Sequence, residues 1–198
     1  YARVHLPVAP ACNVQCRFCN RKFDCVNESR PGVTSVVLSP GQALEYLRRV
    51  RERTPQLRVV GIAGPGDPFA NQQATMETLR LVHETHPDLL LCVATNGLGI
   101  GPHIPSLIRL EISHVTITVN AITPEVGAKV YAWMRDGTRV MSGIKAAEML
   151  WTKQAAAIRQ LSDAHILVKI NSISLPRVTA DAIPRVPEQL KASGATPE

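Results

Sequence analysis

Short apolar runs alternate with amphipathic segments along most of the chain. The apolar runs occupy residues 3–8, 59–63, 89–94, 114–119 and 166–173, and each has the length of one buried strand. Each run leads into a polar turn and then into residues whose apolar positions recur at helical spacing. Strands that are continuous apolar runs and alternate with helices are typical of a parallel sheet with covered faces. The pattern therefore predicts a series of β-loop-α units.

The helical segments of these units differ in how sharply they are marked. They are residues 40–54, 75–86, 104–110, 144–164 and 180–193. The first has the clearest start, because Ser39 suits the N-cap and Pro40 suits the first helical position. The last contains Pro184 and Pro187, which oppose a continuous helix. We still expect a helix there, since it would complete the fifth unit.

Repeated units of this kind predict an α/β fold, a partial (β/α)6 TIM-like barrel whose last strand is missing from this chain. The chain begins at Tyr1 rather than at Met, and it ends at Glu198, where a sixth strand would be due. We therefore expect one domain over residues 1–198, cut at both ends from a longer protein. A polar and aromatic insertion at residues 123–143 is long for a loop, so we expect it to be functional or locally structured.

Composition excludes several classes of protein. Hydrophobic residues make up 45% of the 198 residues and charged residues 19%, a balance that supports a buried core and excludes a disordered chain. No apolar run approaches the ~20 residues that a membrane-spanning helix needs. The net charge of +6 is spread along the chain and only 4% of residues are aromatic, which disfavours a nucleic-acid interface. We expect neither a membrane nor a nucleic acid as a partner.

The cysteines carry the most specific chemical signal. Four of the five lie between Cys12 and Cys25, and Cys12, Cys16 and Cys19 have the spacing Cys-x3-Cys-x2-Cys on one loop. An odd number of cysteines, in a sequence that shows no secretory leader, disfavours a secreted disulfide framework. It predicts a cytoplasmic protein whose thiolates bind metal. Structural zinc usually takes four protein ligands, whereas a four-iron cluster held by three cysteines leaves one iron open for chemistry. A zinc site completed by Cys25 is the alternative.

Polar residues follow the predicted strands. They include the loop that carries Cys12, Cys16 and Cys19, here called the cysteine loop, the turns at residues 64–68 and 95–97, Asn120 and Asn171. In barrels the active-site groups come from the loops after the strands, and all of these loops lie at one edge of the sheet. The sequence therefore predicts a single site at that edge.

The cysteine spacing after the first strand, with Phe18 directly before the last cysteine, resembles the signature of the radical S-adenosylmethionine (SAM) enzymes. The resemblance implies that Cys12, Cys16 and Cys19 hold a [4Fe-4S] cluster whose open iron binds SAM. It also implies reductive cleavage of SAM to methionine and a 5′-deoxyadenosyl radical, so that the three cysteines are catalytic as well as metal ligands.

The same resemblance implies which residues surround SAM. The turn Gly64-Pro65-Gly66-Asp67 resembles the family's glycine-rich turn that receives the SAM amino group, with Asp67 as the anion where Glu is usual. The later asparagines lie where the family contacts the ribose and the methionine carboxylate. The implied cofactor-binding set is Phe18, Gly64, Gly66, Asp67, Thr95, Asn96, Asn120 and Asn171.

Longer stretches resemble one branch of this family, the nitrogenase cofactor maturases. They are residues 5–32, 60–68, 94–97 and 116–121, and the similarity extends over nearly the whole chain. The branch implies a lyase-type maturation that fuses [4Fe-4S] clusters into an eight-iron precursor. One SAM donates a methyl group, and a radical from a second SAM abstracts hydrogen from it, so that its carbon becomes the carbide. A ferredoxin or flavodoxin electron donor and a scaffold or carrier protein as acceptor are implied as partners.

The additional clusters would be substrates with ligands of their own. The resemblance implies Cys25, Glu28 and Cys92 for this role, because thiolates suit iron and a carboxylate is a labile ligand. We expect Cys92 near the top of its strand, within reach of the space above SAM. Nearby basic residues would offset the charge of thiolate-ligated clusters; they are Arg17, Arg21, Lys22 and Arg30.

Other functions stay open. A radical SAM enzyme with a small organic substrate would leave Cys25 and Cys92 without a role, and a non-catalytic iron-sulfur or zinc module would not need the turn at residues 64–67. Cys92 also suits a buried core position, and Glu28 suits a solvated loop. Asn96 and Asn120 also suit helix caps or turns. The maturases carry further ligands before this domain and after the sixth strand, so we expect this chain to hold the SAM cluster and part of one substrate site.

Overall fold

A five-stranded sheet forms the frame of the computed structural model, which describes residues 2–26 and 36–192. Its strands are β1 (Ala2–His5), β3 (Leu57–Ile62), β4 (Leu90–Thr95), β5 (His114–Thr118) and β8 (Leu167–Asn171), in the order β1-β3-β4-β5-β8. Every pairing is parallel. Within the described residues β1 and β8 form the two edges, so the sheet is a partial barrel, as predicted.

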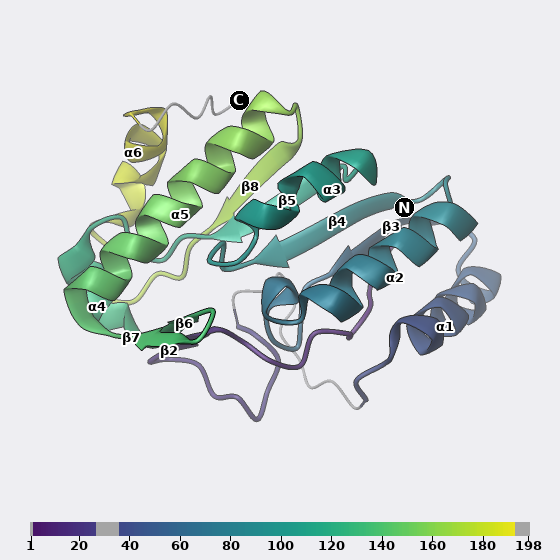
Figure 1. Cartoon of the computed structure of the whole chain (residues 1–198), viewed down its shortest axis with the longest axis horizontal. Helices are drawn as coiled ribbons and strands as arrows, with labels where there is room; N and C mark the ends of the chain where they lie inside the picture. The colour runs from purple at the N-terminus through teal and green to yellow at the C-terminus, as the bar shows by residue number, and fades with distance from the viewer. Residues whose placement is uncertain (1, 27–35, 193–198) are drawn as a thin grey trace.

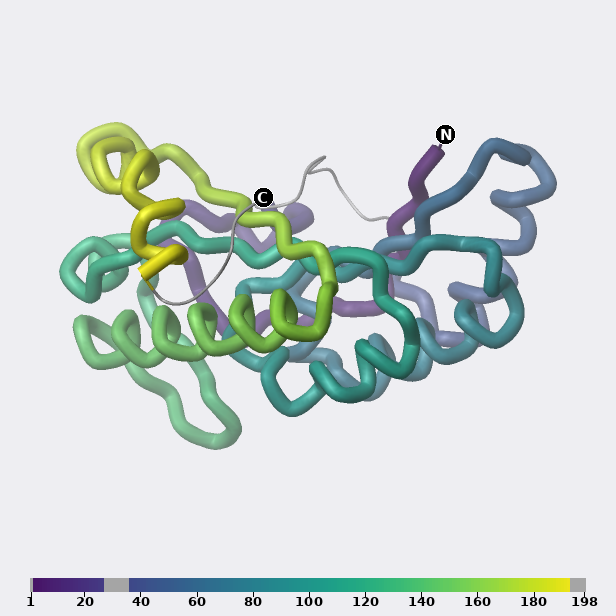
Figure 2. Tube along the Cα trace, turned by 90° about the horizontal axis from the view of Figure 1, so that it is seen from above, coloured from purple at the N-terminus to yellow at the C-terminus, as the bar shows by residue number. Residues whose placement is uncertain are grey.

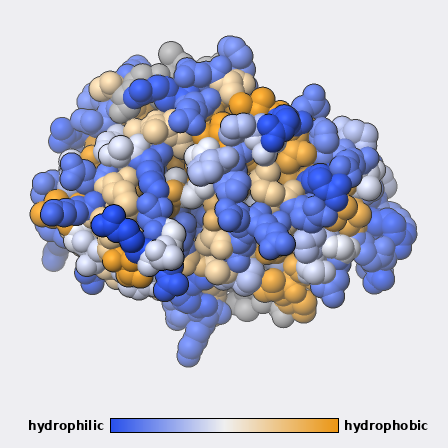
Figure 3. Space-filling view, in the orientation of Figure 1, coloured by the Kyte–Doolittle hydropathy of each residue, from blue (hydrophilic) through white to orange (hydrophobic). Residues whose placement is uncertain are grey.

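Helices cover one face of this sheet (Figure 1), and the view from above shows the long green helix of residues 143–163 lying along one side of the strands (Figure 2). The helices packed on the sheet are α1 (Pro40–Arg53), α2 (Gln72–Thr85), α3 (Ile104–Arg109), α5 (Gly143–Asp163) and α6 (Val186–Ala192). Short 3-10 turns lie at Pro68–Ala70, Gly101–His103 and Ile183–Arg185. Leu47, Leu79 and Leu161 are fully buried between helices and sheet. Outward, the helix layer is mostly polar, with small separate apolar patches (Figure 3).

Helix α1 begins where its sequence predicts. The Ser39 hydroxyl accepts a hydrogen bond from the Gln42 amide at 3.3 Å, and the Gln42 side chain accepts one from the Ser39 amide at 2.9 Å. These reciprocal bonds satisfy two backbone donors at the helix start, and Pro40 needs no partner there.

The insertion at residues 123–143 has structure of its own. It contains α4 (Pro124–Val130), β6 (Tyr131–Asp136) and β7 (Arg139–Met141). Strand β2 (Val14–Cys16), inside the cysteine loop, pairs with β6 and completes a small antiparallel sheet of order β2-β6-β7. The strand in the cysteine loop was not predicted, because it has three residues and its partner is distant in sequence.

The last predicted helix is wrong in its first half. Residues 180–182 lie in a turn, a 3-10 turn follows at Ile183–Arg185, and α6 begins only at Val186. Proline has no amide donor and disfavours helical conformation in the residue before it, so Pro184 blocks an α-helix that starts earlier. Pro187 is tolerated because it lies in the first turn of α6.

No helix within residues 2–26 and 36–192 is both long and apolar enough to cross a membrane.

Replacing a buried residue of α5 should destabilise the fold far more than replacing an exposed one. Leu161 is 0% exposed and Ile144 is 54% exposed, both on α5. We expect Leu161→Ala to lower the free energy of unfolding by about 2–5 kcal/mol, because it leaves a cavity in the core. Ile144→Ala should change it by less than about 0.5 kcal/mol. Urea unfolding checks both, and similar losses would contradict this placement of the helix.

Candidate active site

The cysteine loop opens onto one cavity at the edge of the main sheet. Cys12, Cys16, Cys19 and Cys25 all line this cavity, whose volume is about 480 Å³ including the space open to solvent. Cys16 is buried and ends β2, while the other three thiols are partly exposed. The structure therefore brings the three motif cysteines together with Cys25.

The ends of three neighbouring strands form the rest of this cavity. Gly66 and Asp67 follow β3. Thr95 is the last residue of β4 and Asn96 follows it, and Thr118 is the last residue of β5. The prediction that polar loops meet at the carboxyl edge of the sheet is confirmed for the turns after β3 and β4, whereas Thr118 was not predicted. Arg21 also lines the cavity although it was not in the implied cofactor-binding set, and its guanidinium donates to the Pro10 carbonyl at 2.9 Å.

Gly66 lets the cysteine loop lie directly on the turn after β3. Its amide donates to the Ala9 carbonyl at 2.6 Å, and the Asp67 amide donates to the Ala11 carbonyl at 2.8 Å. A Cβ atom on Gly66 would lie 2.1 Å from the Ala11 carbonyl oxygen, far inside any allowed contact. The glycine is therefore required by the approach of the chain's own backbone, before any ligand is considered.

The loop has a second attachment at Asn71. The Asn71 amide group donates to the Ala11 carbonyl at 2.8 Å and accepts from the Ala11 amide at 3.2 Å. It also donates to the Asp67 carbonyl at 2.8 Å. Asn71 was not predicted as a site residue, although an asparagine soon after a glycine-rich turn is a usual loop-fixing residue.

Asp67 connects the turn after β3 to the turn after β4. One carboxylate oxygen accepts from the Phe69 amide at 2.9 Å, and the other accepts from the Thr95 hydroxyl at 2.9 Å and the Asn96 amide at 2.7 Å. Burial raises the pKa of the carboxyl group, and these donors act in the opposite direction. The structure thus gives Asp67 a positioning role, and contact with the SAM ammonium stays a prediction.

Asn96 connects the same turn to the cysteine loop. Its side-chain amide donates to the Asn13 side-chain oxygen at 2.7 Å and lies 3.8 Å from the Cys12 sulfur. Burial, and next the nearby Asp67 charge, raise the pKa of the Cys12 thiol to about 12. Cys12 is therefore a neutral thiol near pH 7, and a bound metal would have to displace its proton.

Two glutamines that were not predicted hold the surrounding backbone. The Gln15 side-chain amide donates to the Cys16 carbonyl at 2.9 Å and the Cys19 carbonyl at 3.2 Å. On α5, the Gln154 amide donates to the Asn96 carbonyl at 2.7 Å and the Thr118 carbonyl at 2.8 Å. Gln15 could have been recognised by its place between two motif cysteines, whereas nothing in the sequence connects Gln154 to this site.

Other members of the implied cofactor set lie outside the cavity. Asn120 is buried, and its side-chain oxygen accepts from the Ile173 amide at 2.8 Å. Phe18 packs against the apolar cluster beneath the small sheet. Gly64 lies just before the cavity-lining turn and accepts from the Ala9 amide at 3.4 Å. Their contacts with SAM stay predictions.

Cys92 and Asn171 line a second cavity, which also includes Arg3, His5, His114 and Lys169. The expectation that Cys92 lies near the top of its strand is wrong. It is the third residue of β4, level with Gly61 and His114, because the strand continues to Thr95. Ala63 and Ala94 line both cavities, so the two adjoin. Glu28 and Arg30 lie outside the described residues.

The donor set suits a cluster better than a single ion. Within residues 2–26 and 36–192, no three His, Cys, Asp or Glu side chains are placed to hold one metal ion. A four-iron cluster spreads its three thiolates around a cube, more widely than the tetrahedral ligands of zinc. Three thiols on one cavity therefore fit a [4Fe-4S] cluster.

Comparison with known proteins agrees with this geometry. Residues 6–190 match the family described as the Radical SAM superfamily. The chain is 54% identical over 195 residues to the FeMo cofactor biosynthesis protein NifB of Chlorobaculum tepidum, and 50% identical over 196 residues to that of Klebsiella pneumoniae. Each comparison takes in 98% of this chain but only 46% and 42% of those relatives, respectively.

A solved structure shares the fold. The polyhistidine-tagged form of anSMEcpe with bound AdoMet has a TM-score of 0.54 and 14% sequence identity, and the match covers 97% of this chain and 48% of that one. Together these matches confirm the predicted family and the predicted α/β fold.

Substitution of Gly66 should disturb the cysteine loop. We expect Gly66→Ala to lower the free energy of unfolding by about 1–3 kcal/mol and to reduce iron uptake, because the new methyl group meets backbone that cannot give way. Urea unfolding and iron content after anaerobic reconstitution measure these effects. Gly41→Ala on α1 is the control: a Cβ there meets nothing within 4 Å, so iron uptake should not change. Normal iron uptake by Gly66→Ala would contradict the role given to this turn.

Proposed function

Because the chain belongs to the radical SAM superfamily, we propose that it is the SAM-cleaving part of a maturase that builds the iron-sulfur precursor of the nitrogenase cofactor. The observation that carries the proposal is the cavity that Cys25 shares with Cys12, Cys16 and Cys19. A radical SAM site needs only three of these thiols, so the fourth is available to a thiophilic substrate. Similarity to NifB proteins supports an iron-sulfur substrate.

Cys12, Cys16 and Cys19 are the residues that would hold the [4Fe-4S] cluster. When bound, the cluster would supply the electron that cleaves SAM to methionine and a 5′-deoxyadenosyl radical. The chain contributes the fixed position of these ligands: Gln15 holds the carbonyls of Cys16 and Cys19, and Asn96 places an amide donor beside the Cys12 sulfur. Such donors stabilise a thiolate once its proton has left.

The SAM contacts that we propose lie on the same edge of the main sheet. Gly64, Gly66, Thr95 and Asn96 would bind the amino acid end of SAM, and Asp67 keeps the two turns that carry them in register. Asn120 and Asn171 are our candidates for the ribose and the carboxylate. Their positions after β5 and at the end of β8 support this assignment.

Cys25, Glu28 and Cys92 are the proposed ligands of the substrate clusters. Thiolates bind iron well, and the Arg21 guanidinium on the cavity wall would offset part of the negative charge of a thiolate-ligated cluster. Cys92 would serve from the adjoining cavity. The reaction as a whole would fuse two [4Fe-4S] clusters and insert a carbide from a SAM methyl group. A ferredoxin or flavodoxin would donate electrons and a scaffold or carrier protein would accept the product.

Iron analysis and electron paramagnetic resonance test the radical SAM site. After anaerobic reconstitution and reduction, we expect iron of about four atoms or more per chain, a signal that shifts when SAM is added, and release of 5′-deoxyadenosine. Cys12→Ala should lose the shift and the product, because the cluster loses a ligand. A chain that takes up zinc and shows no such signal would sink the enzyme proposal.

Single replacements of the other cysteines test the substrate assignment. Cys25→Ala and Cys92→Ala should keep the SAM-dependent shift but bind less iron beyond the first cluster, because neither residue belongs to the motif set. The iron content and cluster spectra of each variant are compared with those of the parent chain. If neither variant alters iron above about four atoms per chain, the enzyme acts on a small organic substrate instead.

A further inference from the structure

The small sheet β2-β6-β7 has one face on the protein and one face outward. Side chains alternate along a strand, and Val14, Cys16 and Met134 belong to the apolar cluster beneath the sheet. Gln15 and Trp133, which pair across β2 and β6, therefore face outward. Arg135 faces outward with Val140, its partner on β7. We call Gln15, Trp133, Arg135 and Val140, together with the exposed Arg17 that directly follows β2, the outer face.

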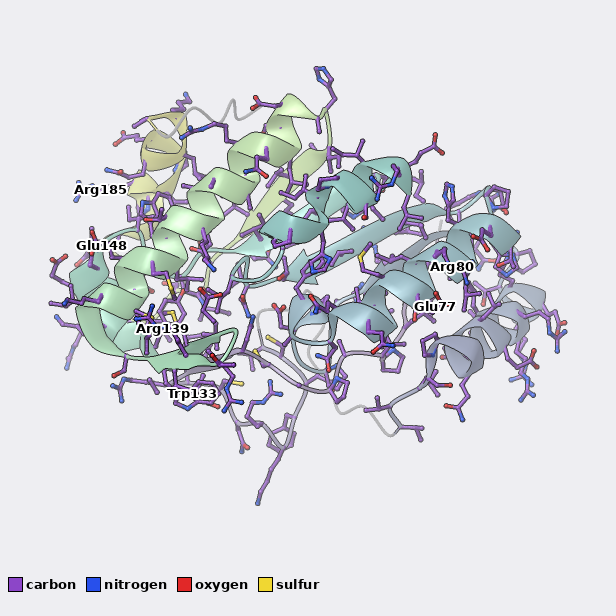
Figure 4. All side chains as sticks on the ribbon, viewed as in Figure 1. Glu77, Arg80, Trp133, Arg139, Glu148 and Arg185 are labelled. Carbon is purple, nitrogen blue, oxygen red and sulfur yellow. The ribbon has the colours of Figure 1, made fainter. Side chains whose placement is uncertain are left out.

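This face carries two arginines that have no carboxylate partner among residues 2–26 and 36–192. They are Arg17 and Arg135, and both are exposed. Asp136 belongs to the opposite face and bonds Lys153 at 2.7 Å. On α2, by contrast, Arg80 lies beside Glu77 at 2.8 Å (Figure 4) and is neutralised by its own helix.

The same face presents apolar groups. Val140 is 57% exposed, and Trp133 is partly exposed although only 4% of the residues in this chain are aromatic. Tryptophan and arginine are enriched among the residues that carry protein-protein binding energy. An outward tryptophan together with exposed arginines therefore has the composition of a docking surface for an acidic protein.

The outer face is also directly attached to the motif cysteines. Gln15 lies opposite Trp133 on the neighbouring strand, and its amide donates to the carbonyls of Cys16 and Cys19. Arg17 directly follows Cys16 in the chain. A protein seated on this face would therefore approach the cysteine loop from the side of Gln15.

We propose that the outer face is the docking surface for the electron donor, a small one-electron carrier protein with acidic residues around its redox group. The assignment rests on the proposed function, which needs an external electron for each SAM cleaved. The carrier is oxidised by one electron, and that electron is consumed as the SAM carbon-sulfur bond breaks to give methionine and a 5′-deoxyadenosyl radical. The surface thus places the reductant on the side of the chain that holds the motif cysteines.

Charge reversal on the outer face, compared with charge reversal on the opposite face of the small sheet, tests the surface. The probe is a recombinant bacterial ferredoxin with an acidic surface, and binding is followed by quenching of Trp133 fluorescence in a Trp151→Phe background. We expect the double variant Arg17→Glu, Arg135→Glu to bind ferredoxin about tenfold more weakly than the parent chain does. Binding by the parent chain should weaken as the salt concentration rises. Val140→Glu should weaken binding too, without removing a guanidinium, which guards against a misfolded double variant.

Arg139→Glu is the matched control. Arg139 is exposed on β7, where it lies opposite Asp136 of β6 in the strand register. It therefore belongs to the face opposite to that of Trp133, and both residues are labelled in Figure 4. Its reversal should change the dissociation constant by less than about twofold. Equal weakening by the two sets of reversals, or none by either, would overturn the proposed surface.

A chemical reductant separates this proposal from the proposed function. With dithionite, the double variant should release 5′-deoxyadenosine at the parent rate, whereas with reduced ferredoxin its rate should fall. A loss with dithionite as well would mean that the arginines serve the site rather than docking, and would overturn the surface. If the parent chain releases no 5′-deoxyadenosine with dithionite, the proposed function fails. The fluorescence measurement still tests whether ferredoxin binds to the outer face.

Discussion

The site depends on one buried carboxylate. Asp67 accepts hydrogen bonds from the turn that follows β4, and its own backbone amide holds the cysteine loop through Ala11. Apart from β2, the loop has no regular structure between Ala9 and Val26 in which its backbone groups could pair. Its position is therefore fixed by these bonds, by those of Asn71 and Asn96, and by the absence of a side chain at Gly66. Loss of the Asp67 bonds or of the close contact at Gly66 would displace the thiols that line the cavity.

Electrostatics makes the same site dependent on its metal. Burial and the Asp67 charge both favour the neutral thiol at Cys12, so without iron the loop carries a protonated cysteine. A bound cation reverses this preference, because it stabilises the thiolate far more than burial destabilises it. The Asn96 amide and the Arg21 guanidinium are placed where they favour negative charge on sulfur. Folding thus prepares the ligands but leaves ionisation to metal binding.

Much of the fold could be predicted from the sequence, and the misses have physical causes. Alternating apolar runs and helical spacing predict every strand of the main sheet, because burial on both faces leaves a strong local signal. The cysteine spacing likewise identifies the motif thiols. Strand β2 and its pairing with β6 leave almost no local signal, since three residues near Cys16 find their partner beyond α4. The level of Cys92 depends on where β4 ends, and a polar turn marks that end only within a residue or two.

The two sheets of this chain serve the site in different ways. The main sheet contributes residues at the ends of β3, β4 and β5, which line the cavity. The small sheet contributes only Cys16 to the cysteine motif, yet its inner face packs under the cysteine loop and its outer face meets solvent. Because β2 belongs both to the small sheet and to the cysteine loop, any partner that presses on Trp133 acts on the strand that carries Gln15 and Cys16. The insertion at residues 123–143 therefore forms the surface beside the cysteine loop, although it contains no cysteine itself.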